Sequence, residues 1–338
     1  MAKSARVIIG SILGAIAAFV VLHGIATLQI RKRLAEGIRK NCPSCELEIG
    51  TIRISLLDFS VGFHDIRFGW GNSQATRVDA RIDRILADLS PRFAREVEIS
   101  EVRVDKPVVT VTEGDRVGAP SPGEGPESPW TFAVRELRIE DGLFHYVRVR
   151  ETGKAILRVS AIQGAVGAFG TAVGLRETET VGRAEGRLER SGKFELEITA
   201  SPFARNKALA VDLKIDGQKL SDLNPFLKAD DGILLSGVLR QGRSSVRING
   251  KRLTGSTVAK YDGLDIQFEK TEDRGALKAL LSNLVQELRV NETKPEFLPG
   301  ERKGSLVELE REKGEPIVKF ILRGMRESAL KVATGPKE

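Results

Sequence analysis

The chain contains 338 residues, of which 41% are hydrophobic, 29% are charged and 5% are aromatic, and its net charge is +7. This length is sufficient to bury a hydrophobic core without disulfides or metal ions. The low aromatic content argues against a surface that binds bases or sugars by stacking, and the 34 glycines are typical of a chain with many turns between short strands.

The N-terminus predicts a membrane anchor. A short tail, residues 1–6, carries Lys3 and Arg6 and precedes an apolar run over residues 7–28, in which His23 is the only ionisable side chain. As a helix this run would be about 33 Å long, which matches the hydrocarbon core of a bilayer. The alternative is a signal peptide cleaved near residues 24–26, but the run is longer than a usual signal core and favours an uncleaved single-pass span.

Three small residues in this span, Gly10, Gly14 and Ala18, recur at every fourth position. Such spacing would let two spans pack closely as a dimer. Small residues are common in membrane spans in general, so the spacing alone leaves dimerisation open.

The positive charge is concentrated beside the span. Residues 1–40 contain seven basic side chains and one acidic side chain, so +6 of the net +7 lies there. The charge-balanced remainder argues against a nucleic-acid partner, and the flanking cations suit anionic lipid head groups. Five of these basic residues follow the span, which on charge alone would place the body in the cytoplasm. A short basic N-terminus before an apolar run is also typical of an exported signal-anchor, so the residues leave the topology open.

A helical extension over residues 29–41 is expected to end before Pro43, because proline interrupts helices. The only two cysteines, Cys42 and Cys45, form a C-x-x-C motif beside it. A zinc site would need two further ligands, and a redox motif would be expected beside a βαβ unit. We therefore favour a local disulfide or an inert turn over redox chemistry.

From Glu46 onward the apolar residues recur at every second position, which predicts β-strands in two segments, residues 46–117 and 130–270. One apolar and one polar face predict an antiparallel sheet with one side in water. A step in the alternation at Gly50 predicts a bulge or a hairpin. Expected turns lie at Asp141–Gly142, Ser191–Gly192, Asp216–Gly217, Asp231–Gly232, Asn249–Gly250 and Asp262–Gly263.

The segment between the two β segments, residues 118–129, is rich in Gly, Pro, Ser and Glu and is expected to be a flexible loop at a domain boundary. Residues 97–113 before it and 132–149 after it share the same order of apolar and charged positions. This similarity indicates a repeating β unit.

Two further elements are expected near the C-terminus. Residues 275–289 predict an amphipathic helix with five leucines on one face, and this helix would pack on the sheet, cover an apolar groove or lie on a membrane surface. Residues 303–324 predict a hairpin that turns at Lys313–Gly314.

The sequence offers no catalytic, cofactor-binding or metal site. His23, His64 and His145 are far apart, and neither a zinc-protease nor a serine-hydrolase motif is present. Residues 186–193 approach a phosphate-binding loop but have five residues between the glycines where that motif has four. Carboxylates alternate with Lys and Arg along the strands, as on a solvated sheet face. We therefore expect a protein that is not an enzyme and needs no cofactor.

The order of these parts resembles the AsmA-like family of bacterial envelope proteins. The similarity extends over residues 1–270 and lies in the anchor, in residues 49–68 and in residues 81–113. In the family an x-V-x-V-x-x-P-x-V-x-V strand follows a strand pair, and here the matching residues are Val102, Val104, Pro107, Val109 and Val111. Residues 132–146 and 222–256 are similar to later strands of shorter members.

This resemblance implies an anchor in the bacterial inner membrane and a body in the periplasm, against the charge count. It also implies a long curved sheet, a β-groove or β-taco, whose apolar concave face holds phospholipid acyl chains. Larger relatives are thought to pass lipid between two membranes, but some 14 strands at about 4.8 Å each would give this chain a groove of only roughly 65 Å. The resemblance then implies that this chain extracts lipid from the inner membrane, assists envelope assembly or acts together with other envelope proteins.

The candidate groove lining consists of alternate apolar side chains, which would replace the contacts that an acyl chain loses on leaving a bilayer. They are Val102, Val104, Leu137, Ile139, Leu209, Val211, Leu213 and Ile215. The alternatives are a face that packs on itself as an ordinary core, and a structural scaffold that binds other envelope proteins by its sheet edges without lipid.

Overall fold

A computed structural model gives the structure of the protein and describes most of its β-rich body. The described ranges are 44–55, 58–71, 76–90, 96–114, 131–150, 153–204, 208–268, 302–303 and 307–312, with residues 32, 36, 42, 317, 320, 321, 323–325, 327 and 328. The predicted span 7–28, the loop 118–129 and the helix 275–289 lie outside the described residues. Within those ranges, no helix combines the length and hydrophobicity needed to cross a membrane.

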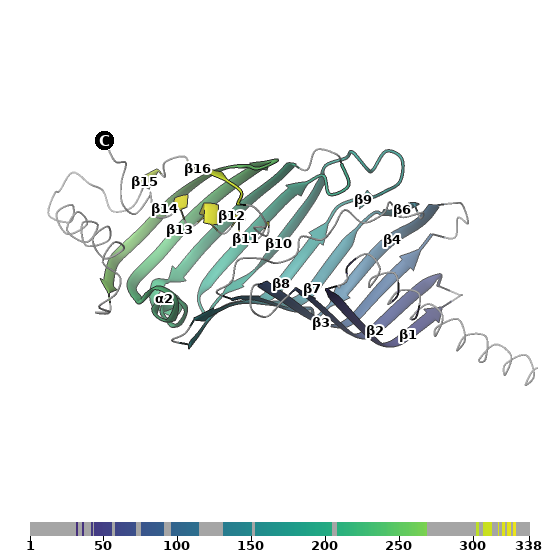
Figure 1. The fold of residues 1–338 in the computed structure, drawn as a ribbon, viewed down its shortest axis with the longest axis horizontal. Coiled ribbons are helices and arrows are strands. Elements are labelled where there is room, and N and C mark those ends of the chain that lie inside the picture. Colours follow the sequence, from purple (N-terminus) through teal and green to yellow (C-terminus); the bar gives the residue numbers. More distant parts are fainter. Residues whose placement is uncertain are drawn as a thin grey trace, which may run out of the picture.

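The described residues form one large sheet (Figure 1). Its first eight strands are β1 (Cys45–Ser55), β2 (Ser60–Gly71), β3 (Thr76–Leu89), β4 (Glu96–Asp105), β5 (Val108–Glu113), β6 (Thr131–Val134), β7 (Leu137–Arg150) and β8 (Gly153–Val166). The remaining strands are β9 (Phe169–Gly170), β10 (Thr180–Leu188), β11 (Gly192–Ala200), β12 (Ala208–Lys219), β13 (Ile233–Asn249), β14 (Arg252–Phe268), β15 (Arg302–Lys303) and β16 (Val307–Glu310). A 3-10 helix, η1 (Leu220–Leu223), and helix α2 (Asn224–Asp231) connect β12 to β13.

The sheet is mixed, which corrects the prediction of a purely antiparallel sheet. Strands β4 and β5 run parallel to β6 and β7, whereas the other pairs are antiparallel. Parallel neighbours cannot be joined by a tight turn, so the chain needs a crossover connection between β5 and β6. The strands on both sides of this connection belong to one sheet, and it is not a boundary between separate sheets.

The two similar sequence segments pair with each other. Val97 lies beside Phe132, Val102 beside Leu137 and Val108 beside Leu143, at a constant separation of 35 residues. The internal repeat is therefore two adjacent, parallel strand lines that present the same residue types to the same faces.

A line of irregular residues crosses the sheet, and we call it the crease. Asp65, Lys106 and Asp141 each have a positive φ, and the register of the flanking pairs places them on one line across β2 to β7. Ala161 in β8 also has a positive φ, beside a register shift. At the crease each strand contains one extra residue, which shifts the alternation of apolar and polar side chains by one position. The same face of the sheet is therefore apolar on both sides of the crease. Such irregularities also bend strands.

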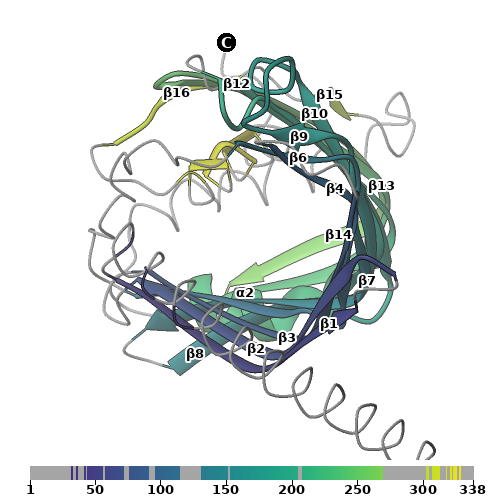
Figure 2. The ribbon, with the colours of Figure 1, turned by 90° about the vertical axis from the view of Figure 1, so that its right-hand side faces the viewer.

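Seen along its long axis, the sheet curls into an open C (Figure 2). The Gly50 step in β1 lies opposite Asp65 within one continuous strand pair, which excludes a hairpin at that position. A Cβ atom at Gly50 would lie 2.8 Å from Cβ of Asp65, so the close approach of the two strands favours glycine here.

The C-terminal hairpin prediction is half wrong. Residues 307–310 form β16 on the edge of β14 as expected, but the described residues from Ile317 to Ser328 are helical. We call these the C-terminal helical segment. Phe320, Ile321 and Met325 are spaced so that a helix turns all three toward the sheet, where they pack on the core of β12–β14. Burial of these three side chains selects the helix over the second strand.

At the other end, Cys42 and Cys45 are joined by a disulfide. Lys32 and Glu36, the described residues of the predicted helical extension, are helical and form an i,i+4 ion pair.

The positive φ of Ala161, at the end of the crease in β8, can be tested by substitution. Ala161→Gly should raise the free energy of unfolding by about 0.5–1 kcal/mol, because glycine removes the steric cost of a positive φ. Ala184→Gly, in extended β10, should lower it by about the same amount. Urea denaturation of the full chain, followed by circular dichroism, measures both. Equal destabilisation by the two substitutions would contradict a left-handed backbone at Ala161.

Candidate functional site

One face of the sheet carries apolar side chains across eleven successive strands, except for Ser244 and Thr257 at its far end. Directly paired residues point to the same side of a sheet, and their register defines two adjacent rows from β1 to β14. Row A is Ile52, Phe63, Ile85, Val104, Ile139, Gly164, Ala184, Leu196, Leu213, Ser244 and Thr257. Row B is Ile54, Val61, Ala87, Val102, Leu137, Val166, Gly182, Ile198, Val211, Val246 and Gly255.

All eight candidate lining residues lie on this face. Val104, Ile139 and Leu213 belong to row A, and Val102, Leu137 and Val211 belong to row B. Leu209 and Ile215 flank them in β12. Phe63 and Ile85 were not predicted to line this face, and only the register shows that Phe63 lies beside Ile85 and Ile85 beside Val104.

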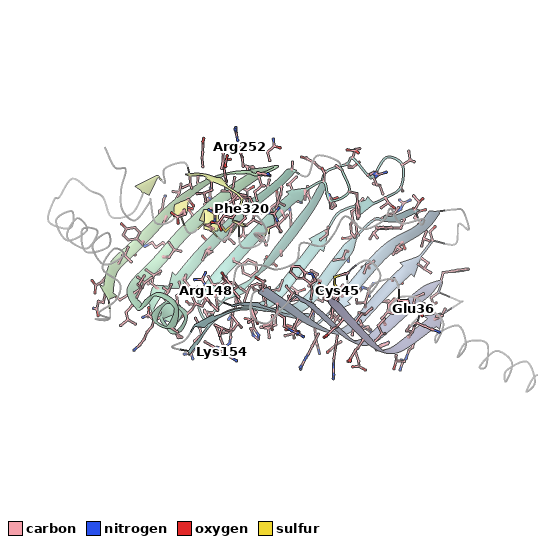
Figure 3. All side chains as sticks on the ribbon, viewed as in Figure 1. Glu36, Cys45, Arg148, Lys154, Arg252 and Phe320 are labelled. Atoms are coloured by element: carbon pink, nitrogen blue, oxygen red, sulfur yellow. A yellow bond between two sulfur atoms is a disulfide. The ribbon has the colours of Figure 1, made fainter. Side chains whose placement is uncertain are left out.

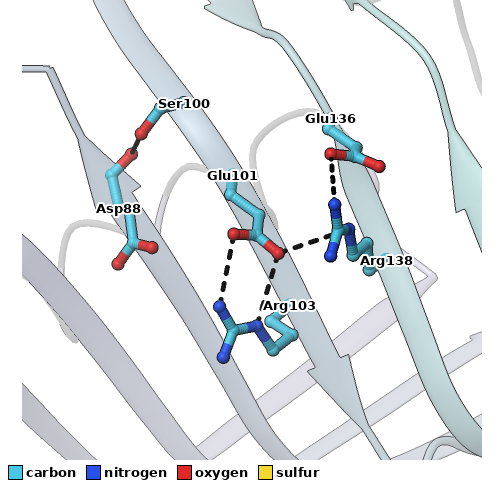
Figure 4. Close-up of polar contacts among 6 residues, drawn as sticks. All are labelled: Asp88, Ser100, Glu101, Arg103, Glu136 and Arg138. Atoms are coloured by element: carbon cyan, nitrogen blue, oxygen red, sulfur yellow. Dashed lines mark hydrogen bonds and ion pairs between the residues drawn. The ribbon is translucent and has the colours of Figure 1, made fainter.

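The opposite face is charged. The residues that lie between rows A and B but point the other way include Arg103, Arg138, Arg183, Glu197 and Asp212. Figure 4 shows part of this face: Glu101 contacts Arg103 at 3.2 Å and Arg138 at 3.5 Å, and Arg138 contacts Glu136 at 3.0 Å. The hydrogen bond from Arg138 lowers the pKa of Glu136. These pairs are solvated, so they keep this face wet and add little stability.

A hollow of about 750 Å³ also lies on the charged face, over β10 to β13. Among its lining side chains, Arg183 pairs with Glu197 at 2.8 Å and Lys214 with Glu195 at 3.3 Å. These four charges are satisfied by one another, and we assign the hollow no ligand.

The apolar face is the concave one. Phe320 packs on Val211 and Val246 of row B, and the segment that carries Phe320 lies inside the curve in Figure 2. Helix α2 gives a second marker, because the ring of its Phe226 lies 5.9 Å from the ring of Tyr146 on the same face. Figure 3 labels Phe320, and it also labels Arg148, which lies two residues after Tyr146 in β7.

The concave face is only partly covered. Val102, Leu137 and Ile139 are half-buried, and Ile198 is 36% exposed. A core residue between two packed layers would be almost fully buried. Among the described residues, the only elements that lie on this face besides the strands are α2, η1 and the C-terminal helical segment. The face therefore presents apolar side chains that the described part of the chain does not cover.

The side chains on the concave face are smallest near the middle of the sheet. Gly164, Gly182 and Ala184 line β8 and β10, between larger side chains on β7 and β11. A Cβ at Gly164 would lie 3.0 Å from the carbonyl oxygen of Arg183, so this position favours glycine. Small side chains leave more space above the sheet here than the Val, Ile and Leu on either side.

The rows also correct the expected length of the apolar face. Strands β4 and β5 form one line along β3, and β6 and β7 form one line along β4 and β5. Eleven strands at about 4.8 Å spacing give a face about 48 Å long, shorter than the roughly 65 Å expected from the sequence.

One polar cluster interrupts the apolar face beyond the crease. The Tyr146 hydroxyl donates a hydrogen bond to the Glu113 carboxylate, and Arg148 contacts the same carboxylate at 3.3 Å. Glu113 and Arg148 are 12% and 16% exposed, and Tyr146 is 8% exposed. The register brings them together, because Val111 lies beside Tyr146 and Glu113 beside Arg148. Local patterns did not predict this cluster, since Glu113 lies 33 residues before Tyr146 and 35 residues before Arg148.

Burial raises the pKa of the Tyr146 phenol, and the adjacent Glu113 carboxylate raises it further. The phenol therefore stays protonated and acts as a hydrogen-bond donor, and it offers no nucleophile at ordinary pH. Among the described residues, no three His, Cys, Asp or Glu side chains are grouped to hold a metal ion. The chemistry available on the concave face is apolar contact and hydrogen bonding.

Comparison with known proteins adds no identification, because no family model and no curated protein matches the chain.

The Tyr146 pKa gives a measurable expectation. An ordinary tyrosine ionises near pH 10, whereas folded Tyr146 should remain protonated at about pH 11. Wild type and Tyr146→Phe should then show the same phenolate absorbance at that pH, and urea unfolding should make them differ. Since the folded state holds this proton more tightly, the stability that it contributes is present below about pH 10 and is lost as the pH rises further.

Circular dichroism at the same pH provides the control that both proteins are folded. A phenolate difference between the two folded proteins near pH 10 would show that Tyr146 is not buried beside Glu113.

Proposed function

We propose that the protein is a membrane-anchored envelope protein whose concave apolar face binds phospholipid acyl chains and shields them from water outside the bilayer. The observation that carries the proposal is the pair of rows, which are apolar from β1 to β12 and include the partly exposed Leu137, Ile139 and Ile198. The charged convex face supports it, because a sheet that is wet on one side and apolar on the other needs a cover for its apolar side.

The energetic requirement is plain. Each methylene that leaves a hydrocarbon environment for water costs about 0.8 kcal/mol, so a chain of about 15 methylenes would lose roughly 12 kcal/mol. Contact with Val, Ile, Leu and Phe side chains on rows A and B would offset this cost. Head groups would remain in water at the open side of the curve. The proposal includes no bond-breaking step and no cofactor.

The anchor and the location are part of the proposal. The apolar run at 7–28 and its basic flank support an inner-membrane anchor, and the resemblance to AsmA-like proteins supports a periplasmic body. A face of about 48 Å suits the shielding of lipid close to one membrane, or a step in envelope assembly with partner proteins.

A second candidate function is a scaffold that binds other envelope proteins without lipid. Among the described residues, β1 pairs with β2 alone, so its outer edge presents backbone groups that can pair with a strand of another protein.

Topology can be tested with a C-terminal alkaline phosphatase fusion. We expect the full chain to give an active fusion, because this enzyme forms its disulfides and becomes active only outside the reducing cytoplasm. A matched β-galactosidase fusion should be inactive. An inactive phosphatase fusion with an active β-galactosidase fusion would instead place the body in the cytoplasm.

Lipid binding can be tested with two adjacent substitutions. Ile198 lies on the concave face and Thr199 on the charged face. We expect the purified full chain to carry phospholipid detectable by mass spectrometry after detergent exchange, Ile198→Asp to lose most of it, and Thr199→Asp to retain it. A buried charge without a partner repels acyl chains, whereas an added carboxylate on the wet face does not meet them.

Circular dichroism shows whether both variants fold. A wild-type chain that carries no phospholipid beyond what a protein with the anchor alone retains would reject lipid binding and leave the scaffold.

A further inference from the structure

We infer that the C-terminal helical segment is a built-in stop that closes the apolar face at β12–β14, so that acyl chains occupy only the part from β1 to β11. This inference rests on the proposed lipid binding and adds where the bound chains end.

Exposure along row B drops between β11 and β12, although Ala87 in β3 is buried too. Ile198 in β11 is 36% exposed, whereas its neighbours Val211 in β12 and Val246 in β13 are 4% and 0% exposed. These side chains are in direct register and belong to the same face. The difference arises because Phe320 of the segment, itself 0% exposed, packs on Val211 and Val246 together with Leu253. The segment thus occupies the surface that the row would otherwise offer to a ligand.

The sheet under the segment differs from the rest of the concave face. Row A ends in Ser244 and Thr257, and row B ends in Gly255, where the other strands mostly carry Val, Ile, Leu or Phe. Thr257 donates a hydrogen bond to Ser244 at 3.0 Å and is also hydrogen-bonded to Ser328 of the segment, at 2.6 Å. Ser328 and Thr257 are both buried. Bare hydrocarbon would leave these hydroxyl groups with fewer partners, so this end suits a peptide occupant better than an acyl chain.

The backbones also approach closely at this point. A Cβ at Gly324 would lie 2.6 Å from Cδ2 of Leu253, and the carbonyl oxygen of Gly324 is the nearest neighbour of a Cβ built on Gly255, at 3.5 Å. Leu253 is 0% exposed and belongs to the core of β12–β14. Gly324 thus permits a contact that a larger residue on the segment would disrupt.

The segment is fixed from its outer side as well. Arg323 donates a hydrogen bond to the carbonyl oxygen of Glu310 in β16 at 2.8 Å, and its guanidinium lies 5.3 Å from the centre of the Phe320 ring. Strand β16 itself pairs with the edge of β14. The segment is thus held by apolar packing, by hydrogen bonds and by its link to β16 on the edge of the sheet. We therefore expect it to stay in place and not to be displaced by an acyl chain.

The stop can be tested by photo-crosslinking. The full chain would be placed in membranes that contain a phospholipid with a diazirine at the end of one acyl chain, irradiated and digested, and the lipid-modified peptides mapped. We expect adducts on concave-face residues from β1 to β11, including the peptide with Ile198, and none on β12–β14. In Gly324→Leu, which forces the segment away from Leu253, adducts should appear on β13 and β14.

Ile317→Leu is the matched control, because Ile317 lies on the same segment, is 37% exposed and should keep the wild-type pattern. Adducts on both Ile198 and Val246 peptides in wild type would overturn the stop while supporting lipid binding. If Gly324→Leu does not fold, this wild-type map alone decides. The absence of adducts from the whole concave face in every variant would instead reject the proposed function.

Discussion

The structure depends on one constraint: a single sheet with a charged face must still keep water from its apolar face. Most sheets meet this requirement by packing on a second layer of strands or helices. Here the sheet curls toward its apolar side, and among the described residues only α2, η1 and the C-terminal helical segment lie against that side. Ion pairs such as Glu101–Arg103 hold the convex face in water, so the two faces cannot be exchanged. The curl reduces the exposure of the apolar rows but leaves Ile198 uncovered.

The crease makes this curl compatible with alternation. A strand that bends by inserting one residue would normally turn its apolar side chains to the opposite face. At Asp65, Lys106 and Asp141 the insertions lie in register on neighbouring strands, so pairing continues on both sides and the apolar face is kept. The positive φ at these positions costs little for aspartate and more for lysine. The bend therefore spreads across the sheet as one feature, and no single strand has to carry it alone.

The same positions explain what could be predicted from the sequence. Alternation located most strands and all eight candidate lining residues on one face. Asp141–Gly142, Asp216–Gly217 and Asp262–Gly263 were predicted to be hairpin turns but lie inside β7, β12 and β14, because an irregular strand position and a turn both need residues that tolerate positive φ. The parallel pairing of β4–β5 with β6–β7 and the Glu113–Tyr146–Arg148 cluster depend on register between distant segments, which local patterns do not encode. The prediction of a final hairpin failed because the spacing of Phe320 fits both periods, and the packing of Phe320, Ile321 and Met325 on the core of β12–β14 selects the helix.

These features bear on how lipid would move if the proposed binding is correct. A conduit between two membranes needs an apolar path that is open at both ends. The concave face is continuous from β1 to β11, and β1 is the first strand after the predicted anchor in the sequence. At β12 the path meets Phe320 and the hydroxyl groups of Thr257 and Ser328. A lipid that entered near the anchor would then leave by the same end or sideways through the open side of the curve. That geometry favours temporary shielding of lipid beside one membrane over transport along the whole length of the sheet.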